Sequence, residues 1–214
     1  KVGQSQYNLR VLYFMKKILG VGHITVPSKV SSSSCAEYRI RDMKHLKEKI
    51  LPIFDKYPLR TSKQFQYEMF RKSLLVYTNS SMNKDEKEKL LTYYKSQKAP
   101  MNYISIVWKD VNEEFLTVEQ VQSILSKEWI VGFTEAEGSF YLAKKGPSRI
   151  SHCFEITQKK DKIVLKAISL LLDMKVIEKH TYFSCVTTNQ ASVHKVIDYF
   201  FKTIKGIKSL EYRI

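Results

Sequence analysis

The stretch WIVGFTEAEGSF, residues Trp129 to Phe140, joins an apolar run to two acids and then stops at a glycine. Its apolar residues follow helical spacing, which places Glu135 and Glu137 at the C-terminal end of a predicted helix. That end carries the negative pole of the helix macrodipole, so each carboxylate costs a few tenths to about 1 kcal/mol there. We therefore expect a partner that offsets these charges.

Small residues in the same stretch suggest a packing partner. Gly132 and Ala136 are four residues apart, with Trp129 and Phe133 beside them. A helix face with small side chains lets another helix approach closely. If two such helices pack side by side, their carboxylate ends meet, and like charges at one place favour a bound divalent cation.

Composition and charge limit the possible functions. The chain has 214 residues, of which 43% are hydrophobic and 12% aromatic, enough to bury the core of one large domain or two small ones. Lys and Arg number 36 against 21 Asp and Glu, a net charge of +15, which indicates a polyanion partner, nucleic acid before an anionic membrane surface. No apolar run approaches the roughly 18 residues of a membrane span, which predicts a soluble or peripheral protein.

Other composition features concern origin and metal binding. The start KVGQSQYNLR has neither methionine nor a signal-peptide pattern, so we expect the chain to begin inside a longer protein. Lysine outnumbers arginine and Ile, Tyr and Phe are frequent, as in products of AT-rich mitochondrial genes. The three cysteines and five histidines show no ligand spacing, which predicts free thiols and no zinc site.

An internal repeat organises the chain. The segment VLYFMKKILGVGHI (11–24) aligns with VLKAISLLLDMKVI (164–177) at an offset of 153 residues (164 − 11). At this offset Ser5 falls on Gln158, and further along Lys63 and Tyr67 fall on Lys208 and Tyr212. Any two amphipathic helices can be overlaid by chance, but the shared order helix, strand, strand, helix and then K-x-x-x-Y favours a true repeat.

The repeat predicts two halves, residues 1–77 and 129–214, joined by a polar linker with helices of its own at 78–128. In the first half we predict helices at 8–20, 43–58 and 63–77, with Pro52 interrupting the second, and strands at HITVPS and AEYRIR. Thr117 and Gln120 have the spacing of a capping box, which predicts the start of the last linker helix.

These segments together resemble the LAGLIDADG family of homing endonucleases and group I intron maturases. WIVGFTEAEGSF looks like the motif that names the family. KKILGVG, YRIRD, HLKEKILPIFDKYP and SKQFQYEMFR are similar to the first half of the two-motif enzymes of mitochondrial cytochrome b introns. The resemblance implies an α+β fold, a monomer of two αββαββα halves related by a pseudo-twofold axis, whose antiparallel sheets form a basic saddle over a duplex. The motif helix of the first half is then missing from this chain.

The resemblance also implies site residues. Glu137 takes the position of the acid that binds Mg²⁺, Lys63 and Lys208 take that of the basic residue after the last helix of each half, and Gln158 that of the glutamine ending the second strand. The lysines and Gln158 have plainer alternatives: Lys63 and Lys208 as ordinary phosphate anchors or surface lysines, and Gln158 as a strand end. In the first half the matching position is Ser5, so either the register slips by one residue or that half lacks the glutamine.

Alternation along the predicted strands indicates further nucleic-acid contacts. In the second half these are Lys144, Lys145, Arg149, His152 and Lys179, and in the first half His23, Thr25, Lys29, Arg39 and Arg41. A second set, expected on helices or helix starts outside the saddle, is Lys16, Lys17, Lys44, Lys47, Lys49, Lys159, Lys160 and Lys162. This second set is either a solvated face or a basic surface for folded RNA.

Two functions stay open at this point. The favoured one is a maturase in the mitochondrial matrix that binds and stabilises its own group I intron RNA, with the RNA supplying the chemistry and a helper splicing protein as a possible partner. The alternative is a Mg²⁺-dependent DNA endonuclease that makes double-strand cuts. Binding to a membrane surface is disfavoured, because the basic residues do not lie on a helix with a large apolar face.

Overall fold

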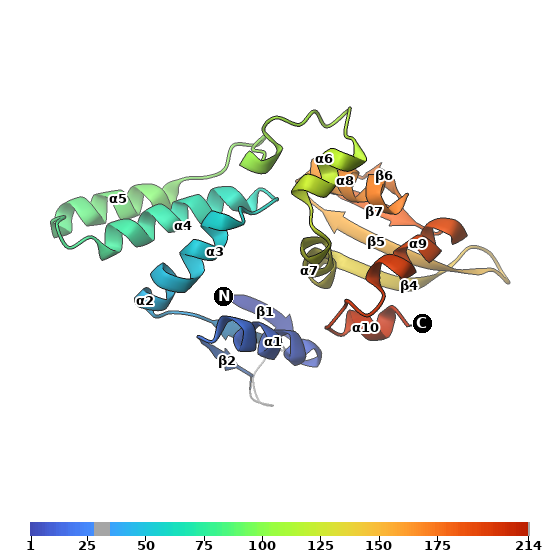
Figure 1. Ribbon diagram of the computed structural model, residues 1–214, viewed down its shortest axis with the longest axis horizontal. Helices are drawn as coiled ribbons and strands as arrows, with labels where there is room; N and C mark the ends of the chain where they lie inside the picture. The colour runs from blue at the N-terminus through green and yellow to red at the C-terminus, as the bar shows by residue number, and fades with distance from the viewer. Residues whose placement is uncertain (28–34, 214) are drawn as a thin grey trace. The chain divides into compact units, whose positions relative to one another are not determined.

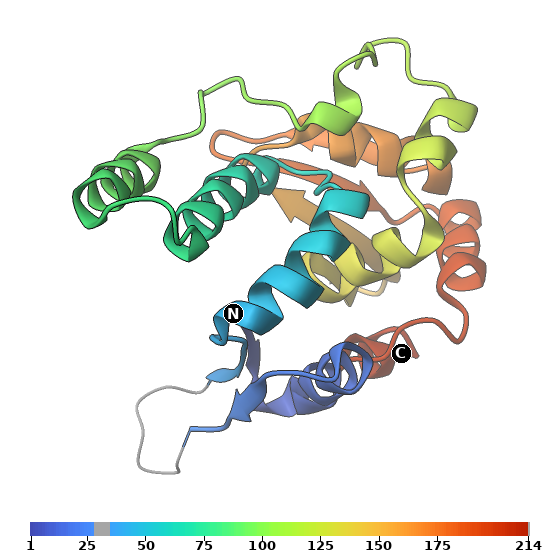
Figure 2. The same ribbon diagram turned by 60° about the vertical axis from the view of Figure 1, so that its left-hand side comes forward.

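The computed structural model describes residues 1–27 and 35–213 and divides into two compact units, residues 1–109 and 110–214 (Figure 1). The boundary between the units falls within the segment predicted as a linker. Figure 2 shows the same elements from a second direction. Each unit contains one antiparallel sheet with helices packed against it.

The second unit has the αββαββα order that the sequence predicts. Its elements are α6 (Val118–Ile124), α7 (Lys127–Glu137), β4 (Gly138–Lys144), β5 (Ile150–Gln158), α8 (Lys162–Leu172), β6 (Lys175–Glu178), β7 (Phe183–Thr187), α9 (Gln190–Phe200) and α10 (Lys208–Glu211). The sheet order is β4-β5-β7-β6, with every neighbouring pair antiparallel. The run from α7 to α9 confirms the predicted α+β half.

One face of this sheet is covered by helices α8 and α9. Phe154 is 1% exposed, and its ring centroid lies 5.5 Å from that of Phe200 on α9 and 4.6 Å from that of Phe140 on β4. Helix α8 is buried along most of its length because its sequence is apolar nearly all round. The alternate residues form the opposite face, here called the polar face, which includes Ser139, Tyr141, Glu155, Thr157 and Ser184.

The first unit repeats this order from its first strand onward. Its elements are β1 (Val2–Ser5), η1 (Gln6–Asn8), α1 (Leu9–Leu19), β2 (His23–Thr25), β3 (Cys35–Arg39), α2 (Met43–His45), η2 (Leu46–Ile50), α3 (Leu51–Lys56), α4 (Lys63–Thr78), α5 (Lys84–Ser96) and η3 (Ile106–Trp108). The sheet order β1-β3-β2 matches β5-β7-β6. Among the described residues of this unit there is no counterpart of α7 or β4.

Local details support the repeat. Leu12 on α1 and Leu165 on α8 are both fully buried. Helix α1 ends at Gly20 with φ 67°, and α8 ends at Asp173 with φ 54°, so both helices stop in the left-handed conformation at matching positions. Glycine suits this conformation best, whereas Asp173 tolerates it.

The predicted interruption at Pro52 takes the form of a π-helical turn. Residues Leu46–Ile50 are π-helical, and the N–H of Leu51 donates to the carbonyl of Leu46, five residues back. Proline has no N–H and its ring presses on the preceding turn, so a wider turn before Pro52 lets the helix continue into α3.

Part of the predicted linker packs on the first unit. Trp108 is 2% exposed, and its Nε1 donates to the carbonyl of Arg60 at 2.8 Å. Ser105 Oγ donates to the carbonyl of Leu59 at 2.5 Å. At the far end of the segment, Thr117 and Gln120 form the predicted capping box of α6.

Two further features concern the cysteines and the lengths of the helices. Cys35, Cys153 and Cys185 are all free thiols, the last two of them buried. None of the helices in the described ranges is long and apolar enough to cross a bilayer.

Candidate functional site

The C-terminal end of α7 presents its two acids in different directions. The helix is capped at its start by Ser126, whose hydroxyl accepts from the N–H of Trp129 at 3.2 Å. It ends at Glu137 because Gly138 begins β4 directly. A Cβ at Gly138 would lie 2.8 Å from Thr134 Cγ2 and 2.9 Å from its carbonyl oxygen, so only glycine fits the tight passage from helix to strand.

Glu135 binds main-chain amides. Its Oε1 accepts from the N–H of Lys205 at 2.5 Å and from that of Gly206 at 2.6 Å. Two amide donors offset the unfavourable position of this carboxylate at the helix end. Glu135 is therefore a structural acid that fixes the loop before α10, and it needs no metal for this.

Glu137 lies exposed at the edge of an open hollow. The hollow has a volume of about 630 Å³ and is lined by Glu137, Glu155, Thr157, Gln158, Lys159 and Tyr182. Within the part of the chain that the structure describes, Glu137 makes no hydrogen bond or ion pair, so its carboxylate is available to a ligand. Two residues predicted as site residues from the sequence, Glu137 and Gln158, thus meet in one place.

A second acid in the hollow, Glu155, is held by hydroxyls from both neighbouring strands. Tyr141 Oη on β4 donates to Glu155 Oε2 at 2.8 Å, and Ser184 Oγ on β7 donates to Glu155 Oε1. Burial raises the pKa of Tyr141, and Cys153 and Glu155 raise it further, so this hydroxyl stays protonated and keeps donating. The two hydroxyls therefore fix the position of the Glu155 carboxyl group on the polar face.

Sequence reasoning missed Glu155. The signal was present, because Glu155 alternates with Thr157 and its strand ends at Gln158. The sequence reasoning looked for cations on this face and assigned no role to an acid. The hydroxyls of Tyr141 and Ser184 reach Glu155 only through strand pairing, which the sequence does not specify.

Oxygen donors in the hollow fit part of a magnesium site. Mg²⁺ prefers oxygen ligands and is commonly held by one or two carboxylates together with water and substrate phosphate. Glu137 supplies one free carboxylate and Gln158 an amide oxygen. No group of three or more His, Cys, Asp or Glu side chains that could hold a metal occurs among residues 1–27 and 35–213, so water and phosphate would complete the coordination.

The two predicted lysines begin matching helices. Lys208 is the first residue of α10 and is half-buried, but it does not line the hollow. Lys63 is the first residue of α4, and its Nζ lies 3.3 Å from Gln66 Oε1. In the same helices Tyr67 Oη donates to the carbonyl of Leu51 at 3.2 Å, and Tyr212 Oη donates to that of Ile197 at 2.6 Å. The K-x-x-x-Y repeat is therefore also a structural repeat, because each tyrosine ties its helix to the preceding one.

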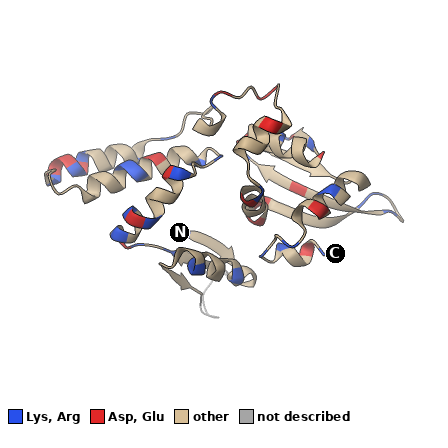
Figure 3. Ribbon diagram, viewed as in Figure 1, with Lys and Arg blue, Asp and Glu red and all other residues tan. Residues whose placement is uncertain are grey.

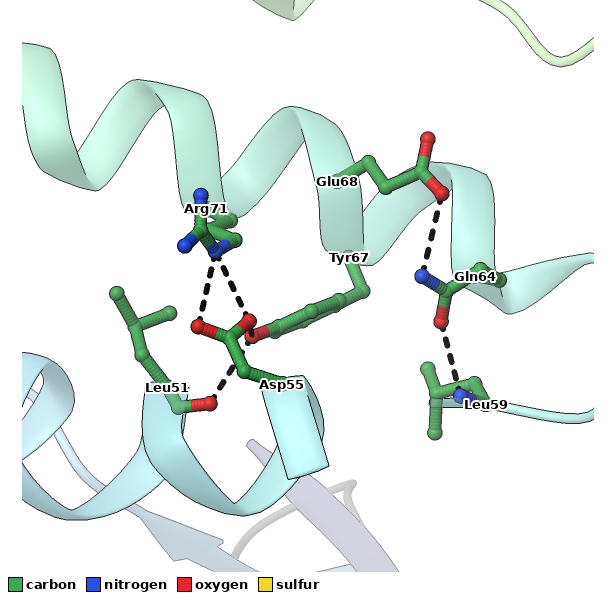
Figure 4. A network of polar contacts seen from close by, with 7 residues as sticks. All are labelled: Leu51, Asp55, Leu59, Gln64, Tyr67, Glu68 and Arg71. Atoms are coloured by element: carbon green, nitrogen blue, oxygen red, sulfur yellow. Dashed lines mark hydrogen bonds and ion pairs between the residues drawn. The ribbon is translucent and has the colours of Figure 1, made fainter. Parts of the chain in front are cut away.

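Polar contacts hold α4 in the first unit (Figure 4). Tyr67 Oη lies 2.5 Å from Asp55 Oδ1, and Arg71 Nε contacts both oxygens of Asp55 at 2.9 and 3.1 Å. Gln64 is 6% exposed; its amide oxygen accepts from the N–H of Leu59 at 2.8 Å. These contacts position the start of α4 and with it Lys63.

Strand pairing settles which residue of the first unit corresponds to Gln158. The buried residues Tyr38 and Cys185 occupy the same place in β3 and β7, since they pair with Ile24 and Val176 on one side and with Val2 and Ile156 on the other. Two residues beyond Val2 and Ile156 stand Gln4 and Gln158.

The counterpart of Gln158 is therefore Gln4, one residue from Ser5, and Ile24 matches Val176 rather than Ile177. Gln4 Oε1 accepts from Nδ2 of Asn8 at 3.0 Å, and Asn8 is 2% exposed. The register slip that the sequence left open is the alternative that the strand pairing supports.

Lys and Arg occur on helices, strands and loops of both units (Figure 3), and the other candidate residues fall into several places. Lys144 ends β4 in phase with Phe140, and so not on the polar face, while Lys145, Arg149 and Lys179 lie in turns. The N–H of Lys145 donates to the carbonyl of Arg149 at 2.8 Å. Lys16 and Lys17 are exposed in the last turn of α1, and Arg41 is exposed after β3. Exposed side chains at His23 and Thr25 lie on β2, and Lys29 lies outside the described residues.

Three placements differ from the expectation. His152 lines a pocket of about 360 Å³ beside Phe154 and Val196, on the helix-covered face, because it alternates in phase with the buried Phe154. Lys159 lines the hollow of Glu137 and Lys160 follows it in the same loop, because α8 begins only at Lys162.

Arg39 is the third residue whose placement differs from the expectation. It forms an ion pair with Glu37. Hydrogen bonds from Lys1 and Arg39 lower the pKa of Glu37, so this pair is charged at neutral pH. The charge that Arg39 offers to a phosphate is partly neutralised.

The family model described as LAGLIDADG endonuclease matches residues 1–74 and 130–214. The chain belongs to the LAGLIDADG endonuclease family. The two matched segments cover most of both sheets and the stretch around Glu137.

Relatives agree with this membership. The chain is 37% identical to "Probable intron-encoded endonuclease Cox1-I1b" of Schizosaccharomyces pombe, over 100% of this chain and 54% of the relative. It is 25% identical to "Probable intron-encoded endonuclease 2" of Neurospora crassa, over 87% of this chain and 41% of the relative. The chain thus spans about half the length of these curated relatives, and the narrower resemblance to cytochrome b intron products stays a prediction.

Solved LAGLIDADG structures have the same fold. The structure of I-SmaMI bound to an uncleaved DNA target with calcium ions superposes with a TM-score of 0.78 at 24% identity, covering 99% of this chain and 76% of that one. The structure of I-AabMI bound to uncleaved DNA gives a TM-score of 0.75 at 22% identity, covering 99% and 77%. The predicted fold class is confirmed.

Proposed function

We propose that the chain carries the scaffold of a DNA endonuclease that binds a duplex on the polar faces of its sheets and hydrolyses phosphodiester bonds with Mg²⁺ at Glu137. The observation that carries this proposal is the hollow in which the unpartnered Glu137 carboxylate lies beside Gln158. The net charge of +15 and the DNA-bound state of the I-SmaMI and I-AabMI structures support it.

The residues of the hollow suit phosphodiester hydrolysis. A bound Mg²⁺ would polarise the phosphate and lower the pKa of a coordinated water. Glu137 would hold the metal, and the Gln158 amide, which both donates and accepts, would orient a water beside the phosphate. Lys208 and Lys63 each begin a helix and would contribute cations near the scissile strand, on the roles that the family resemblance implies.

Replacing Glu137 tests the proposal. The Glu137→Gln variant of the complete protein should lose Mg²⁺-dependent cleavage of target DNA while its affinity for the duplex stays within about twofold, because the carboxylate serves the metal and not the groove. Glu128→Gln, at the opposite end of α7, is a matched control that should cleave normally. Cleavage at the wild-type rate by Glu137→Gln would remove Glu137 from the site.

A second candidate, a maturase for a mitochondrial group I intron RNA, is favoured by a different observation. Residues 1–36 contain no acid, and helix α1 exposes lysines on the side away from its sheet. Both relatives are named as intron-encoded, so the polyanion in this proposal is an intron transcript, and we propose the mitochondrial matrix as the location. A helper splicing protein is compatible with this role.

Splicing separates the two candidates. If the protein is a maturase, Glu137→Gln should leave splicing of the intron nearly unchanged, because the RNA supplies the chemistry. Splicing that proceeds equally well without the protein would exclude the maturase function, whatever the outcome for DNA cleavage.

A further inference from the structure

Helix α1 has an outer face that combines cations with exposed aromatic rings. Its inner face packs on the sheet, where Leu12 is fully buried against Ala36 and Tyr38. The outer face of α1 consists of Arg10, Tyr13, Phe14, Lys17 and Ile18, which follow the i, i+3, i+4, i+7, i+8 spacing of one helix side. Tyr13 is 55% exposed, Phe14 48% and Ile18 67%.

Charge on this part of the chain has one sign. From residue 1 to residue 36 the sequence has no Asp or Glu, and its cations are Lys1, Arg10, Lys16, Lys17 and Lys29. Most surfaces of this lysine-rich protein also carry acids, as helix α5 does with Asp85, Glu86 and Glu88. The outer face of α1 is therefore suited to a polyanion and not to a mixed-charge protein surface.

The internal repeat provides a comparison for this face. At the offset of 153 residues, Arg10, Phe14 and Lys17 correspond to Ile163, Ala167 and Leu170 on α8. Ile163 is 4% exposed and Ala167 fully buried, and helix α6 packs against α8. The fold thus accommodates apolar residues at these positions, so the cations and rings on α1 are not required by the architecture.

Exposed rings between lysines have a known use in nucleic-acid recognition. Unpaired bases stack on aromatic side chains while cations contact the phosphates, whereas bases in a duplex are stacked on each other and offer only their edges. The α1 helix and the sheet also separate this outer face from the opposite face of the first sheet, on which Glu37 and Arg39 alternate with the buried Ala36 and Tyr38. A ligand on α1 would therefore not compete directly for the polar face.

We propose that the outer face of α1 binds an unpaired stretch of RNA, with Tyr13 and Phe14 stacking on bases, and with Arg10, Lys17 and the exposed Lys16 on the flank of this face contacting phosphates. The proposal rests on the second candidate function, because the names of the relatives connect this family to intron transcripts, whose loops supply unpaired bases. Tyr7, at 84% exposure just before α1, would extend the stacking surface.

Fluorescence anisotropy with a short unstructured RNA tests the proposal. The double variant Tyr13→Ala/Phe14→Ala should bind the RNA at least tenfold more weakly, as expected when rings that stack on bases are removed. Its affinity for duplex DNA should not change. Tyr93→Ala is the matched control, because Tyr93 is also 55% exposed on a helix but lies on α5, among acids.

Lysine variants and cross-linking give independent readings. Lys16→Ala/Lys17→Ala should reduce the slope of log affinity against log salt by about 1.4, since each phosphate contact to a single strand contributes about 0.7. RNA that contains a photoreactive uridine should cross-link to the wild-type protein within residues 7–18, which does not depend on any variant folding.

Several outcomes would overturn the proposal: RNA affinity unchanged in the double variant, an equal loss in Tyr93→Ala, cross-links only outside residues 7–18, or equally tight binding of single-stranded DNA of the same sequence. The splicing assay is separate from these. If the Tyr13→Ala/Phe14→Ala variant still assists splicing, the α1 binding site is rejected and the maturase function is kept. If RNA still binds on α1 but the protein gives no help to splicing, the α1 site is kept and the maturase function is rejected.

Discussion

At the scale of single residues, Glu135 and Glu137 show how two acids in the same unfavourable place are used differently. Both lie in the last turn of α7, where the helix dipole opposes negative charge. Glu135 recovers this cost from the amides of Lys205 and Gly206, whereas Glu137 has no partner in the described residues. An acid that is kept at a cost and left unpaired is typical of a ligand-binding residue.

This difference predicts opposite effects on stability. Glu135→Ala should lower the free energy of unfolding by about 1–3 kcal/mol, because two amides lose a charged acceptor. Glu137→Ala should leave it unchanged or raise it by a few tenths to about 1 kcal/mol, because a charge is removed from the dipole-negative end. Urea unfolding of the two variants at neutral pH measures both, and a larger loss in Glu137→Ala than in Glu135→Ala would contradict this account.

The same scale shows what the sequence could not provide. The match of Ser5 to Gln158 was an alignment at constant offset, but strand pairing places Gln4 there because the segment before α1 is one residue longer than that before α8. The partners of Glu135 could not be assigned from the sequence either, since the loop at 205–206 lies 70 residues away. Hydrogen bonds between distant segments depend on tertiary structure, so they cannot be predicted from local sequence patterns.

At the scale of elements, helix ends were the best-predicted features because their signals are local. The Thr117 and Gln120 capping box and the Gly20 stop both appear where the sequence places them. The start of α8 was less certain, since Asp161 before it adopts a left-handed conformation and makes no side-chain cap. For that reason Lys159, expected near a helix start, instead lines the hollow of Glu137.

The contacts that hold α4 predict a pH effect. Hydrogen bonds from Arg71 and then from Tyr67 lower the pKa of Asp55, so its folded value lies below its unfolded one. A carboxylate of this kind stabilises the fold fully above its unfolded pKa, and the contribution disappears as the pH falls through the folded value, that is below about pH 4. Since Asp55 and Arg71 are 39% and 43% exposed, the contribution of the ion pair is below about 1 kcal/mol.

Asp55→Asn tests this effect. The variant should be less stable than the wild type at pH 7, and the difference between them should shrink between pH 5 and pH 3. Asp110→Asn, an exposed acid outside this network, should show little difference at either pH. Urea unfolding at several pH values makes the comparison, and a difference for Asp55→Asn that grows toward pH 3 would be the wrong sign.

At the scale of the whole molecule, the repeat predicted two halves and the charge a polyanion partner, whereas the family was predicted from the resemblance of the motif stretches. The repeat gave the order of elements in both units, because each half must bury the same apolar helix faces on a sheet. The charge gave the class of partner but not which cations are free to bind it. Arg39, predicted as a nucleic-acid contact, forms an ion pair with Glu37 on the same strand, β3. The structure is needed to see this pair.

The distribution of free cations predicts how duplex binding depends on salt. Each phosphate that the protein neutralises adds about −0.9 to the slope of log affinity against log salt on duplex DNA, so wild-type binding should weaken steeply between low and moderate salt. Lys145→Ala and Arg149→Ala, in the exposed turn between β4 and β5, should each reduce the steepness by about 0.9 if both contact phosphates. Arg39→Ala should reduce it by less, because an arginine that is held by Glu37 does not itself neutralise a phosphate, and Glu37 keeps its ion pair with Lys1 in the variant. Filter binding over a salt series measures all three slopes. If Arg39→Ala reduces the steepness as much as the hairpin variants do, DNA displaces Glu37 from Arg39 in the complex. A wild-type affinity that does not change with salt would exclude phosphate contacts as its source.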